Sequence, residues 1–183
     1  MKKNVLISTG GSGGHVIPAT IFFQHLKNEF NVFMTSDYRG INFLDKNRYN
    51  VKIIDMPKIS KNIFLLPFQI FLILQAIFKS YFFLKKERID LLISTGGYMS
   101  LPLCVASRIL SIKLFLFEPN MVLGRSNKLF INSCKKIFCY SNKIINFPNK
   151  LKDKISLIPT LLREEFYLAK TNQFLDKEIN LLI

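Results

Sequence analysis

Residues 5–18 read Val-Leu-Ile-Ser-Thr-Gly-Gly-Ser-Gly-Gly-His-Val-Ile-Pro, a short apolar run followed by four glycines and a histidine. The apolar run predicts a buried strand at residues 5–7, and the sequence after the loop predicts a helix over residues 17–28. Glycines directly after a strand let the backbone turn sharply and approach a ligand closely. The start of the following helix offers unpaired N–H groups and the positive end of the helix dipole, which suit a phosphate. The stretch therefore predicts a strand–loop–helix unit that binds an anion.

Two better-known glycine loops do not fit this stretch. No Gly-Lys-Ser/Thr follows it, which excludes a P-loop, and Val16 stands where a dinucleotide-binding fingerprint has its third glycine. Asp37, beyond the next strand, could imitate the acid that binds a ribose in nicotinamide enzymes, so that alternative stays open. A purely structural turn is a further alternative, although it does not account for four glycines that end in a histidine.

The rest of the chain repeats this alternation of apolar strands and helices. Strands are predicted at residues 32–34, 51–54, 91–93, 114–116, 137–139 and 155–158, and helices at residues 63–86 and 101–110, with another beginning near Gly124. Near-continuous apolar strands that alternate with helices indicate a parallel sheet covered on both faces. The sequence therefore predicts an α/β fold with a doubly wound, Rossmann-like parallel sheet.

The last residues indicate a change of organisation. Residues 160–176 have the character of a connector, and residues 179–183, Ile-Asn-Leu-Leu-Ile, begin another strand. A strand without a following helix cannot complete a βαβ unit. We therefore expect a Rossmann-like N-terminal domain at residues 1–160, and at residues 161–183 a connector with the first strand of a second domain that is missing.

Two further motifs follow predicted strands. Residues 94–98 read Ser-Thr-Gly-Gly-Tyr, and residues 117–120 read Phe-Glu-Pro-Asn. Loops after parallel strands share the carboxyl edge of the sheet, where ligands bind, so both should face the crevice of the first glycine loop. Glu118 and Asn120 could orient a sugar hydroxyl or take its proton, or they could cap the next helix.

Composition narrows the range of partners. The chain has 26 Lys and Arg against 12 Asp and Glu, and the net charge of +14 favours anionic lipids, nucleic acids or phosphate-bearing substrates, unless AT-rich compositional drift explains it. It has no zinc-ligand pattern and no basic helix interleaved with aromatic residues, so we expect no nucleic-acid partner. Cys104, Cys134 and Cys139 lie in apolar stretches and predict buried, reduced thiols in a cytosolic protein.

The longest apolar segment, residues 63–78, is flanked by lysines and an arginine. Its 16 residues are broken by one proline and two glutamines, whereas a spanning helix needs about 20 predominantly apolar residues. Apolar residues with basic neighbours favour a helix that lies in the headgroup region of an anionic membrane, and a helix buried within the fold is the alternative. The predicted membrane patch consists of Phe64, Leu65, Phe68, Phe71, Leu72 and Lys79.

In their order and spacing, these motifs resemble the MurG family, glycosyltransferase family 28, over nearly the whole chain. Residues 10–19 and 96–102 are similar to that family's two N-terminal glycine loops. Residues 117–120 resemble its His-Glu-Gln-Asn motif, and Asn127 resembles a later asparagine. Arg163, shortly after a proline, loosely matches its Gly-Asn-Pro-Val-Arg stretch.

Two departures from the family pattern matter for the third motif. Phe117 stands where the family usually has histidine, and Pro119 stands where it usually has glutamine. A catalytic role for this segment therefore rests on Glu118 and Asn120 alone.

The resemblance implies the N-terminal domain of a GT-B glycosyltransferase, in which two Rossmann-like domains enclose the active site. It implies an inverting hexosyltransferase that moves N-acetylglucosamine from UDP-N-acetylglucosamine to the undecaprenyl-diphosphate-linked muramoyl-pentapeptide (lipid I). The product, lipid II, would serve peptidoglycan synthesis, and hence cell wall biogenesis, cell shape and cell division. The C-terminal domain would grip the UDP-sugar while this half holds the lipid acceptor, and neither a metal nor another cofactor is expected.

The resemblance also implies the residues of the site. His15 is expected either to abstract a proton or to contact the acceptor phosphate, and Glu118 is the second catalytic candidate. The expected substrate-binding residues are Ser12, Gly13, Gly14, Gly96, Gly97, Tyr98, Asn120, Asn127 and Arg163.

The expected location is the cytoplasmic side of the bacterial inner membrane, where the chain would be peripherally attached. The C-terminal donor-binding domain would be supplied in cis or in trans. A non-catalytic subunit that docks the membrane and the acceptor in a two-chain transferase is the alternative, and a nucleotide-binding domain of another class is a third. We expect the isolated chain to bind acceptor lipid and anionic vesicles but to turn over slowly or not at all.

Overall fold

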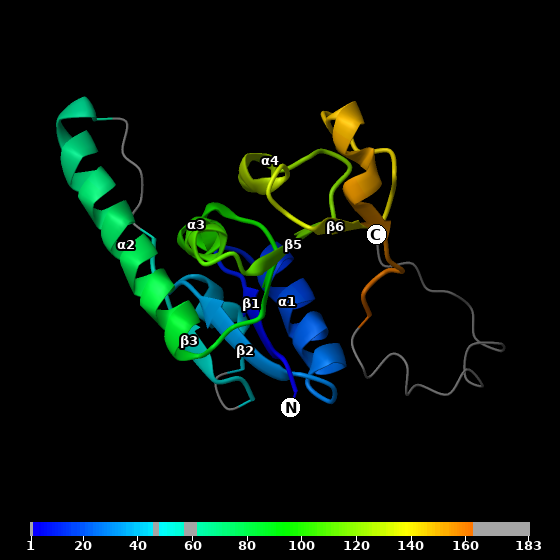
Figure 1. Cartoon of the computed structure of the whole chain (residues 1–183), viewed down its shortest axis with the longest axis horizontal. Helices are drawn as coiled ribbons and strands as arrows, with labels where there is room; N and C mark the ends of the chain where they lie inside the picture. The colour runs from blue at the N-terminus through cyan, green and yellow to red at the C-terminus, as the bar shows by residue number, and fades with distance from the viewer. Residues whose placement is uncertain (1, 46–47, 57–61, 163–183) are drawn as a thin grey trace, which may run out of the picture.

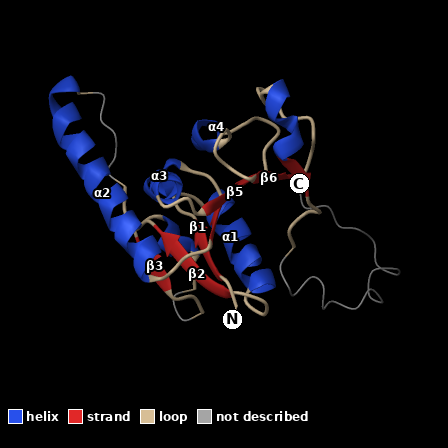
Figure 2. Cartoon of the chain, viewed as in Figure 1, coloured by secondary structure: helices blue, strands red, loops and turns tan. Residues whose placement is uncertain are grey.

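Among the residues that the computed structural model describes (2–45, 48–56 and 62–162), seven strands form one sheet (Figure 1, Figure 2). The strand order is β3-β2-β1-β4-β5-β6-β7, and every pair of neighbours is parallel. The order reverses between β1 and β4, and such a reversal opens a crevice at the carboxyl ends of these two central strands. The predicted doubly wound α/β fold is confirmed.

The elements lie where the apolar runs predicted them, with small shifts at their ends. The strands are β1 (Asn4–Ser8), β2 (Asn31–Ser36), β3 (Val51–Ile53), β4 (Leu91–Ser94), β5 (Lys113–Glu118), β6 (Lys136–Cys139) and β7 (Ile155–Leu157). The helices are α1 (Gly13–Leu26), α2 (Leu66–Lys86), α3 (Leu101–Ile109) and α4 (Arg125–Phe130), with short 3-10 helices at Gly40–Phe43, Ile63–Leu65, Tyr98–Ser100 and Asn149–Lys154. The connector and final strand expected at the C-terminus lie outside the described residues from 163 onward.

The first helix begins earlier than predicted. α1 starts at Gly13 and not at residue 17. Glycine disfavours helix interiors, which made this segment look like loop, but the first helical residues need no intrahelical partner for their N–H groups. Pro18 lies inside the helix, where its missing N–H removes only the bond to the carbonyl of Gly14. Because α1 begins at Gly13, His15 belongs to its first turn.

α2 turns its most apolar side chains outward. It packs on α3, and its buried side chains include Gln69, Ala76 and Ser80, which are small or polar. Its outer side and the turn before it carry five exposed phenylalanines, Phe64, Phe68, Phe71, Phe78 and Phe82. Within the described residues it is the one helix long and apolar enough to cross a membrane by length and composition, with a mean hydropathy of 1.4.

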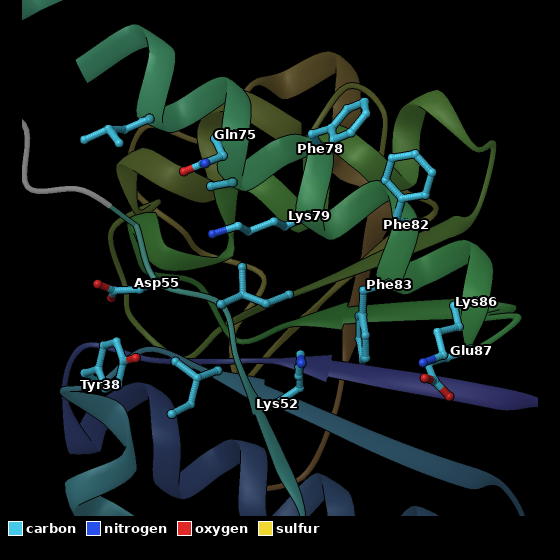
Figure 3. A pocket seen from close by; sticks show the side chains of 14 residues that line it. Tyr38, Lys52, Asp55, Gln75, Phe78, Lys79, Phe82, Phe83, Lys86 and Glu87 are labelled. Carbon is cyan, nitrogen blue, oxygen red and sulfur yellow. The ribbon is translucent and has the colours of Figure 1, made fainter. Parts of the chain in front are cut away.

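The exposure of α2 decides between two interpretations of the long apolar segment. Only 17% of its most apolar window is buried, so the interpretation as a helix buried within the fold is wrong. Between α2 and β3 lies an open groove, into which side chains of both elements point (Figure 3).

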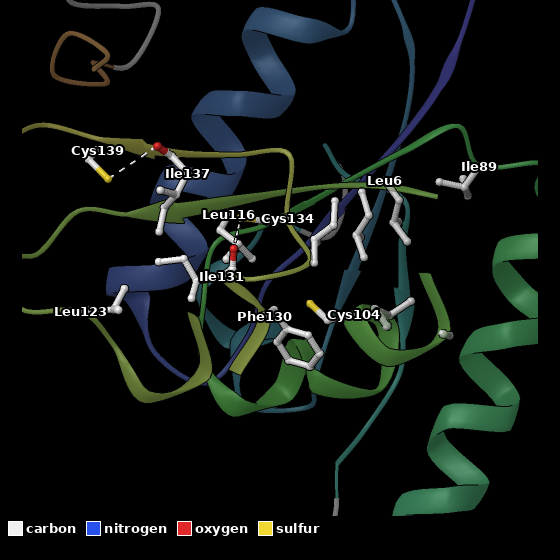
Figure 4. Close-up of a cluster of buried hydrophobic side chains, with 14 of the residues drawn as sticks. Leu6, Ile89, Cys104, Leu116, Leu123, Phe130, Ile131, Cys134, Ile137 and Cys139 are labelled. Atoms are coloured by element: carbon white, nitrogen blue, oxygen red, sulfur yellow. Dashed lines mark hydrogen bonds between the residues drawn. The ribbon is translucent and has the colours of Figure 1, made fainter. Parts of the chain in front are cut away.

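The core follows the alternation of side chains along the central strands. Leu6 and Leu92 point to the face covered by α3 (Figure 4), whereas Val5 and Ile7 point to the face covered by α1. Such alternation places successive side chains of one strand in two different layers. All three cysteines belong to the cluster on the α3 side as free, buried thiols, as predicted.

Candidate functional site

The three sequence motifs meet at the carboxyl edge of the sheet. The first glycine loop follows β1, the second follows β4, and the segment beginning at Glu118 follows β5. The two glycine loops approach each other closely, since a Cβ at Gly97 would lie 3.6 Å from the carbonyl oxygen of Gly10. The prediction that both loops lie together at this edge is therefore confirmed.

The first glycine loop is braced by an acid from the loop after β2. Oδ1 of Asp37 accepts hydrogen bonds from the backbone N–H of Gly11 (2.7 Å) and of Gly40 (2.8 Å), and its side chain is buried. A Cβ at Gly10 would lie 2.6 Å from this carboxylate oxygen, so only glycine fits there. Burial raises the pKa of Asp37, but these hydrogen bonds and Arg39 outweigh it and hold the pKa below its usual value. Because the carboxylate is occupied within the protein, the ribose-binding alternative for Asp37 is excluded.

The ring of His15 bridges the two glycine loops. Its Nδ1 lies 2.7 Å from the carbonyl oxygen of Thr95. A carbonyl oxygen only accepts, so Nδ1 carries the proton and donates it, and the neutral ring keeps its lone pair on Nε2. The second loop also approaches the ring closely at the next residue, because a Cβ at Gly96 would lie 3.2 Å from Cε1 of His15. The contact therefore sets the tautomer that a general base needs.

The start of α1 next to His15 is open to a ligand. Ser12 is the N-cap, but its side chain makes no capping hydrogen bond, and no acidic residue lies in the first turn. Ser12 and Gly14 are exposed, and Gly13 is half-buried. The first N–H groups of a helix have no intrahelical partners and form its positive end. This end of α1 can therefore bind a phosphate.

Tyr98, in the second glycine loop, contacts the segments that follow β2 and β3. Its hydroxyl donates to the carbonyl oxygen of Met56 (3.2 Å), and the guanidinium carbon of Arg39 lies 6.0 Å from its ring centroid. Arg39 Nε also donates to Asp37 (3.0 Å), and Nη2 contacts the sulfur of Met99 (3.3 Å). Arg39 is thus held in one place although its side chain is half exposed.

Glu118 braces the loop after β5. Its Oε1 accepts from the backbone N–H of Asn120 (3.2 Å) and from Nδ2 of the same residue (2.9 Å). Its Oε2 accepts from the N–H of Gly124 (2.7 Å) and from Nδ2 of Asn127 (3.0 Å). Glu118 is 2% exposed, so the carboxylate has no free face toward the crevice. These contacts brace the loop that leads to α4, but among the described residues no side chain caps that helix, and a catalytic role for Glu118 stays a prediction.

Asn127 links the third motif to the second glycine loop. Its Nδ2 donates to the carbonyl oxygen of Phe117 (3.0 Å) and to Glu118, and a Cβ at Gly96 would lie 3.7 Å from this nitrogen. Its Oδ1 is buried and finds no partner within the described residues. Seven buried side-chain atoms of the described residues share this state, and this one lies beside the second glycine loop.

The remaining predicted residues have different surroundings. Asn120 is exposed beside Glu118, and Arg163 lies outside the described residues. Of the predicted membrane patch, Leu72 is half-buried and lines the groove beside β3, whereas the other members are exposed. Among the described residues, no three His, Cys, Asp or Glu side chains gather as a metal site would need.

Sequence reasoning missed Arg39 as a member of this edge. The available signal was the run Asp-Tyr-Arg-Gly at residues 37–40, directly after a predicted strand and thus at the same edge as the glycine loops. It carried no recognisable motif, and the contact between the loops after β1 and β2 is visible only in the fold.

Comparison with known proteins agrees with this geometry. A sequence profile of the glycosyltransferase family 28 N-terminal domain matches residues 5–139. The chain is 60% identical over its full length to a Pelagibacter ubique (strain HTCC1062) protein, a UDP-N-acetylglucosamine–N-acetylmuramyl-(pentapeptide) pyrophosphoryl-undecaprenol N-acetylglucosamine transferase, and covers 51% of it. It is 32% identical to the Prochlorococcus marinus (strain MIT 9301) protein of the same name, over 91% of this chain and 45% of the relative. The chain thus spans about half the length of the curated relatives it matches.

Solved structures give the same architecture. The crystal structure of Acinetobacter baumannii MurG superposes with a TM-score of 0.71 at 25% identity, over 85% of this chain and 45% of that one. The Staphylococcus aureus MnaA–UDP structure superposes with a TM-score of 0.63 at 10% identity, over 85% of this chain and 43% of that one, a likeness of fold alone.

Proposed function

The chain belongs to glycosyltransferase family 28, and on this premise we propose that it is the acceptor-binding half of an inverting N-acetylglucosaminyltransferase. The donor is UDP-N-acetylglucosamine, and the acceptor is the undecaprenyl-diphosphate-linked muramoyl-pentapeptide. The names of the relatives support this choice of substrates. The donor-binding domain is supplied by further sequence in cis or by another chain in trans, since this chain spans half of those relatives.

The contact between His15 and Thr95 carries the proposal. In an inverting transfer, the acceptor hydroxyl attacks the anomeric carbon of the donor, UDP leaves, and the hydroxyl proton must be taken up. Because Nδ1 donates to Thr95, Nε2 of neutral His15 is the acceptor that can take this proton. We therefore assign His15 as the general base rather than as a phosphate ligand.

The neighbouring groups hold the acceptor. The N–H groups of Gly13 and Gly14, at the positive end of α1, bind the diphosphate of the lipid. Asn127 holds the Glu118 carboxylate and the carbonyl oxygen of Phe117 beside the second glycine loop, and substrate binding by Asn127 itself stays a prediction. Asp37 positions the first glycine loop, and Glu118 positions the loop after β5.

The outer side of α2 attaches the protein to the cytoplasmic face of the membrane. Its exposed phenylalanines suit the boundary between headgroups and acyl chains, and Lys79, Lys85 and Lys86 are exposed on the same helix. The net charge of +14 adds attraction to anionic lipids. This attachment brings the crevice to a substrate that never leaves the bilayer.

Transfer of labelled N-acetylglucosamine from UDP-N-acetylglucosamine to a lipid I analogue tests the proposal. We expect transfer when this chain is combined with the C-terminal half of a relative, and little or none with the chain alone. His15→Ala should lower kcat about 10²–10⁴-fold, the usual range for a general base. His25→Ala, at the exposed far end of the same helix, is the matched control and should leave the rate unchanged.

The same assay separates the enzyme half from the alternative of a docking subunit without a catalytic role. For a docking subunit, His15→Ala would raise KM and leave kcat unchanged, because only binding would be lost. Full transfer by the chain alone would contradict the proposed division of donor and acceptor between two domains.

A further inference from the structure

The groove between α2 and β3 has a volume of about 1040 Å³ (Figure 3). Its floor is the edge strand, where Ile53 and Ile54 lie, and its wall is α2, where Phe78, Phe82 and Phe83 lie. This volume is at the upper end of the range of small-molecule pockets. The apolar lining suits a hydrocarbon ligand.

One end of the groove borders the glycine-loop site. Tyr38 and Asp55 line that end, and their chain neighbours Arg39 and Met56 both contact Tyr98 of the second glycine loop. Through these contacts, Tyr98 joins the second glycine loop to the segments that line this end of the groove.

The groove is long enough for an extended segment of a hydrocarbon chain. Its wall runs along α2 from Leu72 to Glu87, which at 1.5 Å per residue is about 22 Å. Phe78 and Phe82 belong both to this wall and to the exposed outer side of α2. The groove thus lies directly beside the surface that we assign to the membrane.

Charge favours a lipid with an anionic head. Lys52, Lys79 and Lys86 line the groove, and within the described residues none of them forms a salt bridge. Lysine stems can cover an apolar ligand while their ammonium groups stay at the rim, among headgroups. The two acids of the lining, Asp55 and Glu87, lie at its opposite ends (Figure 3).

We propose that this groove binds the polyprenyl chain of the lipid whose diphosphate is held by the glycine loops. The isoprene units next to the diphosphate lie between α2 and β3, and the rest of the chain stays in the bilayer. The inference rests on the proposed function, whose acceptor site it extends. It makes the acceptor's lipid chain a ligand of the protein and not only an anchor in the membrane.

The absence of tryptophan from the sequence permits a direct test. Ile53→Trp introduces a single tryptophan on the floor of the groove, and Leu157→Trp introduces one on the opposite edge strand, at a more exposed position (58% against 36%). Each variant of the full chain is titrated, without vesicles or detergent, with geranylgeranyl diphosphate brominated near the end of its chain. We expect saturable quenching of Ile53→Trp and none of Leu157→Trp.

Two further ligands identify what the groove recognises. Brominated geranylgeraniol, which lacks the diphosphate, should bind about tenfold or more weakly, because it loses charge-assisted hydrogen bonds at the glycine loops. Equal affinity for the alcohol, or equal quenching of both tryptophans, would overturn the proposal by marking a non-specific apolar surface. A blue shift of Ile53→Trp that grows with protein concentration alone would also overturn it, since a second copy of the chain would then fill the groove.

Transfer by the recombined halves separates this inference from the proposed function. Ile53→Glu should raise KM about tenfold for an acceptor with a long polyprenyl chain and leave a dimethylallyl-linked acceptor unchanged. If wild type uses both acceptors with the same KM, the groove does not bind the chain although the enzyme assignment stands. If neither acceptor is used, the proposed function itself fails.

Discussion

Nδ1 of His15 lies 2.7 Å from the carbonyl oxygen of Thr95, so a single hydrogen bond joins the helix after the first glycine loop to the second glycine loop. The two residues are far apart in sequence and meet because β1 and β4 are neighbours in the sheet. The bond fixes the ring's orientation and leaves Nε2 as its basic atom. If His15 is the general base that we propose, the second glycine loop orients it through this hydrogen bond.

Gly96→Ala should disturb this arrangement. Gly96 has φ +90°, where an alanine is strained, and its Cβ would lie 3.2 Å from Cε1 of His15. We expect a loss of about 1–2 kcal/mol in the free energy of unfolding, together with a fall in kcat as the ring is displaced. Urea denaturation and the transfer assay measure the two effects.

Gly14→Ala is the matched control for stability. A Cβ at Gly14 meets nothing nearer than 3.8 Å, and the residue lies in the first turn of α1. Alanine should therefore be neutral or stabilising there, by up to about 1 kcal/mol. Equal destabilisation by both substitutions would contradict the assigned contact between Gly96 and His15.

Asp37→Asn should destabilise the fold at neutral pH by about 1.5–3 kcal/mol, because the carboxylate accepts hydrogen bonds from the backbone N–H groups of Gly11 and Gly40. The folded pKa of Asp37 lies below its unfolded value, so this stabilisation is complete above the unfolded pKa near 4 and is lost as pH falls through the folded pKa. Urea denaturation at pH 7 and pH 3 should show the gap between wild type and variant narrowing in acid. Asp153→Asn, at an exposed position, should show no such gap.

Features set by residues close together in the chain could be predicted from the sequence, whereas features set by distant residues could not. The strands and both glycine loops belong to the first kind, because a short apolar run followed by glycines is in itself typical of a strand and the turn after it. The bracing of Gly11 by Asp37 depends on the pairing of β1 with β2, and no local pattern reports it. The outward face of α2 likewise depends on packing against α3, since apolar residues occur all round the helix.

Glu118→Gln distinguishes bracing from catalysis. Each oxygen of Glu118 accepts hydrogen bonds from two donors, and an amide in its place turns one acceptor into a donor that faces other donors. We expect a loss of about 1–3 kcal/mol in stability, with a fall in activity that follows the distorted loop. A large fall in kcat at unchanged stability, with a changed pH profile, would instead make Glu118 a catalytic residue.

The three thiols should be inert in the native protein. Burial raises the pKa of Cys104 and of Cys139 to about 12, and it also raises the pKa of Cys134. Because the thiolate is the reactive form, iodoacetamide at pH 8 should label none of them in the folded chain and all of them in denaturant. Mass spectrometry counts the labels, and native labelling of any thiol within minutes would contradict the burial of that part of the core.

Phe64→Glu combined with Phe71→Glu should detach the protein from anionic vesicles without unfolding it. Both side chains are well exposed, at 89% and 61%, so their loss removes little packing within the fold. Each phenylalanine that leaves water contributes about 1.5–3 kcal/mol, so the double variant should bind at least about a hundredfold more weakly in vesicle sedimentation. Wild-type binding should also weaken with rising salt, because salt screens the attraction between the exposed lysines of α2 and anionic headgroups. Leu157→Glu, on the opposite edge of the sheet, should bind like wild type, and equal loss by this control would mean that net charge rather than the outer side of α2 governs attachment.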